Sequence, residues 1–220
     1  MHFTQPEIEE ASATMKGKAF EAAAATEAEF KRQAGQANIL HLAMHALTND
    51  REPLFSQLVF TQDGDDTTED GRLHAYELQN MKLRADLAVL SACNTGAGKL
   101  QRGEGVMSLS RAFKFAGVPN VVMSLWQADD LSTKTIVGDF FKNLKSGMGK
   151  DRALCQAQRA FVATVPDQHL THPFYWSTLM LVGDGEPLQG NGIPGMLIAI
   201  GALSLLAAGW WGWRYLQKGR

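Results

Sequence analysis

The sequence predicts a three-layer α/β domain with a mainly parallel sheet, followed by one C-terminal transmembrane helix. Unbroken apolar runs at residues 38–43, 86–91 and 119–125 are typical of central strands that are covered on both faces. Between the last two runs, residues 105–117 show helical apolar spacing and end at a glycine, so these three segments predict a βαβ unit. Residues 193–213 contain no ionisable side chain, which predicts the membrane span.

Composition limits the class of protein. The chain has 220 residues, of which 45% are hydrophobic and 20% are charged, and its formal net charge is −2. This balance excludes a disordered acidic or basic tail and supplies enough apolar residues for a core. Because there is no long run of Lys and Arg, we expect no nucleic-acid partner. Cys93 and Cys155 cannot form a disulfide framework and lie at no zinc-finger spacing. We therefore expect no metal and no cofactor, and a functional cysteine would act as a thiol.

The remaining elements follow from residue types and spacing. Residues 7–35 are rich in Ala, Glu and Lys and predict a mostly helical segment that stops at Gly35. Residues 47–80 contain a polar run and an Asp-Gly turn at Asp70 and Gly71, which predicts a surface excursion. Two further amphipathic helices and a last strand are predicted at residues 131–146, 151–164 and 175–182.

The C-terminal segment determines the predicted domain organisation. At about 1.5 Å per residue, a helix over residues 193–213 would cross a hydrocarbon core of about 30 Å, and a buried core helix is the alternative. Trp and Tyr side chains near its end, followed by basic residues, fit a membrane interface. We expect a globular domain over residues 1–187, a linker over 188–192, a single transmembrane helix and a basic tail over 214–220.

The side of the membrane on which the domain lies stays open. The charges after the predicted span are all positive, which favours a cytoplasmic tail and an extracytoplasmic domain. Residues 1–10, however, contain neither the basic start nor the apolar run of a signal peptide, which favours a cytoplasmic domain. A chain that lacks its natural N-terminal portion would explain this conflict.

Two candidate catalytic residues follow two of the predicted strands. His45 comes just after the strand at 38–43, and Cys93 comes just after the strand at 86–91. Because parallel strands end at one edge of a sheet, the two side chains can face each other as a Cys/His dyad. The imidazole would take the thiol proton, the thiolate would attack a carbonyl carbon, and the backbone N–H groups of Cys93 and Ala46 would hold the oxyanion. The alternative is a small buried cysteine and an ordinary hydrogen-bonded histidine.

Other candidate residues have simpler interpretations. His41 lies inside a predicted strand, so we expect a core residue bonded to a neighbouring carbonyl rather than a metal ligand paired with His45. Cys155 lies on a helical face and is expected to pack there. The glycine-rich residues 96–103 lack the Ser or Thr that a phosphate-binding loop requires after its Lys, so we expect a mobile loop beside Cys93. The nucleophile elbow of serine hydrolases, GxSxG, does not occur.

A pair of acidic residues follows the third parallel strand. Asp129 and Asp130 come just before the helix predicted over 131–146, where an aspartate can cap the helix. The alternative is an acidic pocket at the same sheet edge as His45, which would bind a basic side chain of a substrate.

Five motifs occur in the order of a known family. They are residues 39–45 (ILHLAMH), 90–96 (LSACNTG), 103–113 with GEG and RAF, 124–130 with SLW and Asp130, and 172–184 with HPFYW and Gly183–Asp184. Over residues 20–187 the chain therefore resembles the CHAT family, caspase-like domains that often accompany tetratricopeptide repeats and are related to separase. The resemblance implies a caspase/hemoglobinase-like fold and a cysteine endopeptidase with His45 and Cys93 as its dyad.

The chain departs from the family pattern at two positions, and at a third, after the histidine, it has Ala where the family has Gly or Ala. Met44 stands where Thr is common, and Asn94 stands where Glu is frequent. Ala46 follows the histidine, where a glycine would turn its N–H more freely toward an oxyanion. Because the family domain usually begins further upstream, the resemblance also implies a domain that is truncated at its N-terminus.

These observations predict a membrane-anchored, caspase-like cysteine endopeptidase of bacterial signalling that cleaves after a basic residue. Cys93 would be the nucleophile, His45 the general base and then acid, and Asp129 or Asp130 the anchor for the basic side chain. The expected partners are a protein or peptide substrate, the lipid bilayer, and a tetratricopeptide-repeat region or regulator. The alternative function is a catalytically silent scaffold that binds a protein partner at the membrane. A third alternative is a fragment that does not fold, because missing elements leave a strand unpaired.

Overall fold

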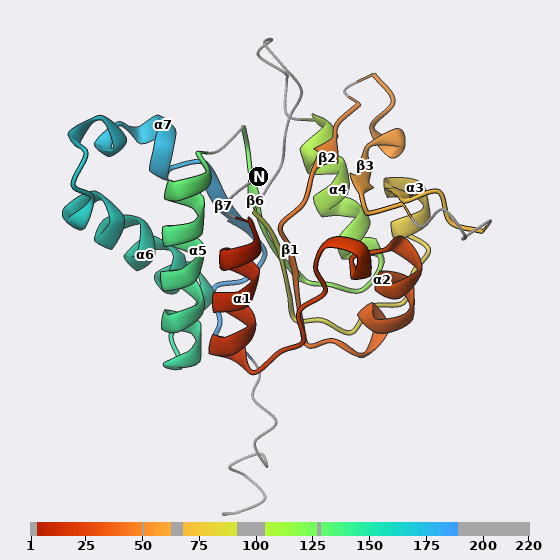
Figure 1. Cartoon of the computed structure of the whole chain (residues 1–220), viewed down its shortest axis with the longest axis horizontal. Helices are drawn as coiled ribbons and strands as arrows, with labels where there is room; N and C mark the ends of the chain where they lie inside the picture. Colours follow the sequence, from red (N-terminus) through yellow and green to blue (C-terminus); the bar gives the residue numbers. More distant parts are fainter. Residues whose placement is uncertain (1–3, 50, 63–67, 92–103, 127–128, 189–220) are drawn as a thin grey trace, which may run out of the picture. The chain divides into compact units, whose positions relative to one another are not determined.

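A computed structural model describes residues 4–49, 51–62, 68–91, 104–126 and 129–188 of the chain. The described residues form a mixed α/β domain with a mostly parallel main sheet (Figure 1). The strand order in this sheet is β1 (Ile39–Leu42), β5 (Leu87–Leu90), β6 (Asn120–Ser124) and β7 (Leu179–Val182). The first three strands are parallel, and β7 runs antiparallel to β6. This confirms the predicted βαβ unit and the three central strands.

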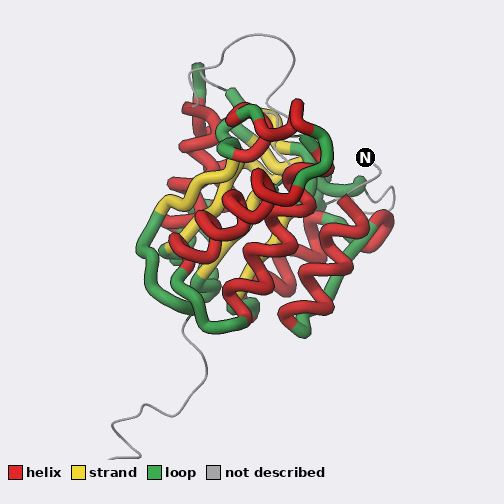
Figure 2. The backbone as a smooth tube through the Cα atoms, turned by 90° about the vertical axis from the view of Figure 1, so that its left-hand side faces the viewer, coloured by secondary structure: helices red, strands yellow, loops and turns green. Residues whose placement is uncertain are grey.

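Helices cover both faces of the main sheet. In Figure 1 the sheet is seen edge-on, with one group of helices on the left and the other on the right. The first group contains α1 (Thr4–Met15), α5 (Asp130–Lys145) and α6 (Lys150–Thr164), and Figure 2 shows these helices in front of the strands. The second group contains α2 (Glu27–Gln33), α3 (Ala75–Leu78) and α4 (Glu104–Phe115). The predicted helices at 105–117, 131–146 and 151–164 are confirmed as α4, α5 and α6.

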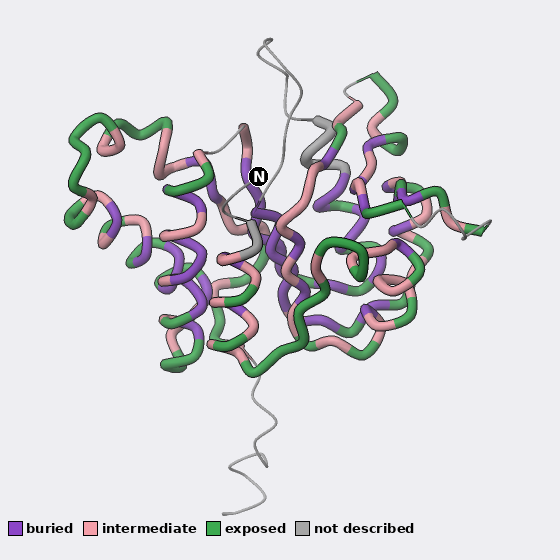
Figure 3. The backbone as a smooth tube through the Cα atoms, in the orientation of Figure 1, coloured by how far each residue is buried: buried purple, intermediate pink, exposed green. Residues whose placement is uncertain are grey.

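Two hydrophobic cores lie on the two faces of the sheet because successive side chains of a strand point to opposite sides. Val89 and Val122 pack with Phe140 of α5 on one face. Leu90 packs with Phe113 of α4 on the other face. Every residue of β5 and β6 is buried, as the unbroken apolar runs predict, and Figure 3 shows this buried centre between more exposed helix surfaces.

The segment at 47–80 was expected to be a surface excursion, and this expectation is wrong in part. It contains β3 (Gln57–Val59) and β4 (Arg72–His74), which form a small antiparallel sheet with β2 (Ala46–Leu47). The short helix η3 (Pro53–Phe55) connects β2 to β3. Leu58 and Leu73 are buried and join the core on the α4 side. These strands were not predicted because each is only two or three residues long, which is too short for a recognisable alternation of apolar and polar residues.

Two other boundaries differ from the expectation. The N-terminal helical segment is interrupted, because Lys16 and Ala22 adopt positive φ and Thr26 starts α2 as an N-cap that accepts from the N–H of Glu29. The last strand begins four residues later than expected. The residues before it form α7 (Pro173–Trp176), whose N-cap His172 accepts from the N–H of Phe174. The short helices η1 (Ala22–Ala24), η2 (Ala34–Gln36) and η4 (Gln168–Thr171) complete the described elements.

The predicted membrane span at 193–213 lies outside the described residues, as do the tail and nearly all of the linker. Within the ranges that the structure describes, no helix is both long enough and apolar enough to cross a bilayer.

Candidate functional site

His45 lies beyond the carboxyl end of β1, in the short connection that leads to β2. The residue is half-buried, and its carbonyl accepts a hydrogen bond from the N–H of Val59 at 2.9 Å. Met44, directly before it, packs against the core on the α4 side. The backbone around His45 is therefore held on both sides, by the pairing of β1 with β5 and by the pairing of β2 with β3.

The register of the small sheet determines where the N–H of Ala46 points. Ala46 lies opposite Leu58. The neighbouring residues His45 and Val59 form a hydrogen-bonded pair, because the N–H of Val59 donates to the carbonyl of His45. Hydrogen-bonded and non-hydrogen-bonded pairs alternate along an antiparallel ladder. The N–H of Ala46 is therefore directed away from β3, and this ladder does not use it.

Cys93, the predicted nucleophile, lies outside the described residues, together with the rest of 92–103. The neighbouring strand ends are well defined: β1 and β5 are adjacent and parallel, and Leu42 lies opposite Leu90. The chain thus leaves both strands at the same edge of the sheet. The convergence of the Cys93 thiol and the His45 imidazole stays a prediction.

His41 was expected to bond to a neighbouring carbonyl, and this expectation is wrong. Its Nε2 lies 2.8 Å from Oε1 of Glu7 in α1 and 3.2 Å from Oγ of Ser91, which follows β5. Glu7 is only 4% exposed and Ser91 only 1%. The carboxylate comes from a helix that packs on the sheet, and no local pattern around His41 points to it.

These three side chains are not a serine-hydrolase triad. In such a triad the two imidazole nitrogens face different partners, the carboxylate and the serine hydroxyl. Here Glu7 and Ser91 both approach Nε2 of His41, and Nδ1 is buried without a hydrogen-bond partner among the described residues. Since the Ser91 hydroxyl is also closed off from solvent, the arrangement has no accessible nucleophile.

Asp129 forms the N-cap of α5. Its Oδ2 accepts from the N–H and from the hydroxyl of Ser132, both at 2.9 Å. Asp130, the first residue of α5, is exposed. Nearby, the indole of Trp126 stacks on Phe174 and donates to its carbonyl. The helix-capping interpretation of Asp129 therefore describes the local structure, and the acidic-pocket interpretation stays a prediction.

Three carboxylates of the α2 side lie close together around a lysine ammonium group. One oxygen each from Glu27, Glu69 and Glu77 lies within 4.8 Å of the others. The Nζ of Lys31 lies between them, 2.7, 2.6 and 3.5 Å from the three oxygens. Burial raises the pKa of Glu27. Burial would lower the pKa of Lys31, but its bonds to Glu27 and Glu69 outweigh this effect and raise that pKa. The Lys31 ammonium group thus occupies the place between the three carboxylates.

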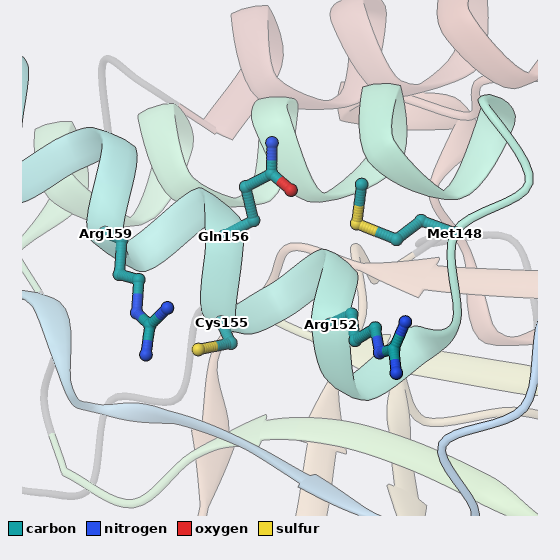
Figure 4. A pocket seen from close by; sticks show the side chains of 5 residues that line it. All are labelled: Met148, Arg152, Cys155, Gln156 and Arg159. Carbon is teal, nitrogen blue, oxygen red and sulfur yellow. The ribbon is translucent and has the colours of Figure 1, made fainter.

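Cys155 was expected to pack on a helical face, but it is exposed. The buried face of α6 contains Ala153, Leu154, Ala157 and Phe161. Successive helix residues are about 100° apart around the axis, so Cys155 is turned away from Leu154 on this face. Figure 4 shows its thiol on the same side of α6 as Arg152 and Arg159, in a surface hollow that Met148 and Gln156 also line. The residues that line this hollow belong to α6, apart from Met148, which precedes the helix.

Comparison with known proteins shows which family this domain belongs to. A family model for the CHAT domain matches residues 1–184. The chain belongs to the CHAT domain family. The CHAT match spans all four strands of the main sheet, which confirms the resemblance seen in the sequence motifs.

Two curated relatives of this CHAT domain are tetratricopeptide repeat proteins. Tetratricopeptide repeat protein 28 of Homo sapiens is 28% identical over 117 residues, and that of Mus musculus is 27% identical over the same length. These alignments cover 53% of this chain and 5% of each relative. The chain therefore corresponds to a small part of these relatives.

Proposed function

We propose that this CHAT domain is a caspase-like cysteine endopeptidase in which His45 and Cys93 form the catalytic dyad. One observation carries the proposal. Leu42 and Leu90 are register partners at the ends of adjacent parallel strands, and His45 and Cys93 each follow their strand's last residue by three positions. Equal offsets from a paired position at one sheet edge favour convergence of the two side chains.

The proposed reaction begins with transfer of the Cys93 proton to the His45 imidazole. The thiolate attacks the carbonyl carbon of the scissile bond, and the N–H groups of Ala46 and Cys93 hold the oxyanion. The imidazolium returns its proton to the leaving amine as the C–N bond breaks, which leaves a thioester on Cys93. A water molecule, deprotonated by His45, then hydrolyses this thioester and restores the thiol. The direction of the Ala46 N–H, away from β3, supports its role.

We also propose that the substrate carries a basic residue at the cleavage site. The helix cap uses Oδ2 of Asp129, so Oδ1 and the exposed carboxylate of Asp130 would supply the negative charge. Both residues follow β6, which lies next to β5 in the parallel part of the sheet. A guanidinium or ammonium group of the substrate would thus be bound two strands away from His45.

Residues 193–213 would anchor the domain in a membrane as a single helix. The absence of ionisable side chains over this length is the supporting observation. Carbonate extraction of membranes tests this part of the proposal. The full chain should stay in the membrane pellet, and a chain that ends at residue 188 should be released.

Active-site labelling tests the dyad. The chain has two cysteines, and the exposed Cys155 would react with any thiol reagent, so the experiment uses a Cys155→Ser background. A peptidyl acyloxymethyl ketone with a basic terminal residue should label this protein once. Labelling should vanish in Cys93→Ala and slow by about 10²- to 10⁴-fold in His45→Ala, which lacks the base.

The same experiment separates the peptidase from the scaffold alternative. Equal labelling rates with and without His45 would contradict the dyad. The scaffold alternative predicts that the wild-type protein binds a protein partner but cleaves no peptide. It also predicts that cells with Cys93→Ala have the wild-type phenotype.

A further inference from the structure

We propose that Glu7 and His41 are positioning residues, which hold the carboxyl ends of β1 and β5 together so that His45 and Cys93 can meet. This inference rests on the proposed function. It concerns a buried contact between α1 and the sheet that lies outside the dyad itself.

The contact is costly to bury, which argues for a specific role. Among the described side chains of α1, the two buried ones are Glu7 and Ala11. An ionised carboxylate in a protein interior is strongly unfavourable unless it is paired and hydrogen-bonded. The imidazole of His41, 10% exposed and 2.8 Å away, provides that partner. An apolar residue at position 7 would have been the cheaper way to pack this helix.

We assign the proton of this contact to Nε2 of His41, which would donate it to Oε1 of an ionised Glu7, because a carboxylate only accepts hydrogen bonds. Oγ of Ser91, at 3.2 Å, accepts the second branch of the same N–H. One imidazole therefore joins α1 to the end of β5. Its ring also packs against Phe141 of α5, with ring centroids 5.2 Å apart.

Ser91 is held at three points. Its N–H donates to the carbonyl of Leu42 at 3.3 Å, its hydroxyl meets His41, and its carbonyl accepts from Oγ of Ser124 at 3.2 Å. These bonds tie the end of β5 to the ends of β1 and β6. Cys93 follows Ser91 by two residues, and His45 follows His41 by four. The cluster therefore holds the two strand ends from which the chain continues toward the proposed dyad.

The position of α1 is also fixed by contacts with α5 that lie away from the sheet edge. Glu10 pairs with Lys142 of α5 at 2.9 Å. A Cβ atom on Gly138 would lie 3.1 Å from Oε1 of Glu10, so the glycine lets the two helices approach closely. These contacts fix how α1 presents Glu7. Because the His41 imidazole is almost fully buried, Glu7 and His41 act through the strand ends and do not touch substrate.

The experiment measures labelling of Cys93 in the Cys155→Ser background and separates the inactivation rate constant, kinact, from the inhibitor binding constant, KI. We expect Glu7→Leu, which removes the acceptor for Nε2 of His41, and Ser91→Ala to lower kinact by about 10- to 100-fold, because small misplacements of reacting groups cost rates of this size. KI should change less than about threefold. Glu9→Leu, the same substitution on the exposed side of α1, is the matched control and should label like wild type.

A conservative exchange distinguishes positioning from general stability. His41→Gln keeps an N–H donor that can reach Glu7 and Ser91, and His41→Leu fills the space without a donor. Relative to wild type, we expect the decrease in log kinact in His41→Gln to be at most half of the decrease in His41→Leu. Circular dichroism should show that both variants are folded. If His41→Leu does not fold, the Ser91→Ala result decides, since that variant removes one hydroxyl and no buried charge partner.

The outcomes separate this inference from the proposed function. Labelling that persists in Cys93→Ala, or wild-type protein that is not labelled at all, contradicts the peptidase and the positioning role with it. Labelling that requires Cys93 and His45 but is unchanged in Glu7→Leu and Ser91→Ala overturns the positioning role alone.

Discussion

The ammonium nitrogen of Lys150 lies 3.1 Å from Oδ1 of Asp184, which joins the start of α6 to the chain just after β7. Lys150 is 1% exposed, and its Nζ also donates to the carbonyl of Glu186 at 2.7 Å and lies 3.5 Å from Oδ2 of Asp86. Asp86 directly precedes β5, so this cluster lies at the opposite end of the strand from the proposed site. It holds the last described segment of the chain against the main sheet.

Removing the buried cation should destabilise the domain. We expect Lys150→Met to lower the free energy of unfolding by about 2–4 kcal/mol, because two carboxylates and a carbonyl lose their shared donor. Urea unfolding followed by circular dichroism measures this loss. Lys145→Met, on the exposed side of α5, is the control and should change the unfolding free energy by less than about 0.5 kcal/mol. Equal values for the two variants would show that the buried contacts contribute nothing.

The Asp184 carboxyl should make stability depend on pH. Its hydrogen bond from Lys150 lowers the pKa of Asp184 below its ordinary value of 3.8. A lowered pKa in the folded state means that the contribution to stability is present above pH 3.8 and is lost as the pH falls through the folded pKa. The difference in unfolding free energy between wild type and Asp184→Asn should therefore be constant near pH 7 and shrink below about pH 4. A difference that grows on acidification would contradict the assignment.

Gly183 should resist substitution for steric reasons. Its φ is +151°, and an added Cβ would lie 2.9 Å from both Cα of Asn120 and the carbonyl oxygen of Pro119. We expect Gly183→Ala to cost about 3 kcal/mol or more from backbone strain and overpacking together. Gly147 also has positive φ, at +88°, but an added Cβ would meet no atom within 4 Å, so Gly147→Ala should cost only about 1 kcal/mol of strain. Similar melting temperatures for the two variants would exclude the close approach at Asn120.

The Lys31 cluster should behave as a coupled unit. Glu27 is 2% exposed, so Lys31→Met leaves a buried carboxylate without its cation and should cost about 3 kcal/mol. Adding Glu27→Gln removes that charge and keeps an oxygen that can accept from the N–H of Arg72. The double variant should therefore be more stable than Lys31→Met alone, as a double-mutant cycle by urea unfolding would show. Simple addition of the two losses would mean that the charges are not coupled.

Asp129 should reveal whether the acidic pair selects substrates. Asp129→Ser retains a good helix cap, whereas Asp129→Ala should lose about 1 kcal/mol of stability. If the pair binds a basic side chain, Asp129→Ser and Asp130→Asn should each reduce the labelling preference for a basic over a neutral peptidyl electrophile, with Asp129→Ser near wild-type stability. An unchanged preference in both variants would leave Asp129 with its capping role alone.

Much of the fold could be predicted because its central elements are encoded locally. The strands β5 and β6 appear as unbroken apolar runs, and α4 and α5 appear as helical spacing between turn residues. Elements of two to four residues were missed or misplaced, as at β2 and α7, because a period cannot be recognised over so few positions. The exposure of Cys155 was missed for a related reason, since it depends on which face of α6 packs inward.

The amino-acid sequence alone indicated the three parallel strands, the family motifs, and the places of His45 and Cys93 just beyond two predicted strand ends. Tertiary structure alone decided the partners of the buried charges. Glu7 meets His41 across 34 positions, and Lys150 meets Asp86 across 64. Apolar periodicity is a short-range property of the chain, so it predicts elements. A buried charge pairs with whatever group the packing of those elements brings within reach, and no spacing in the sequence records that distance.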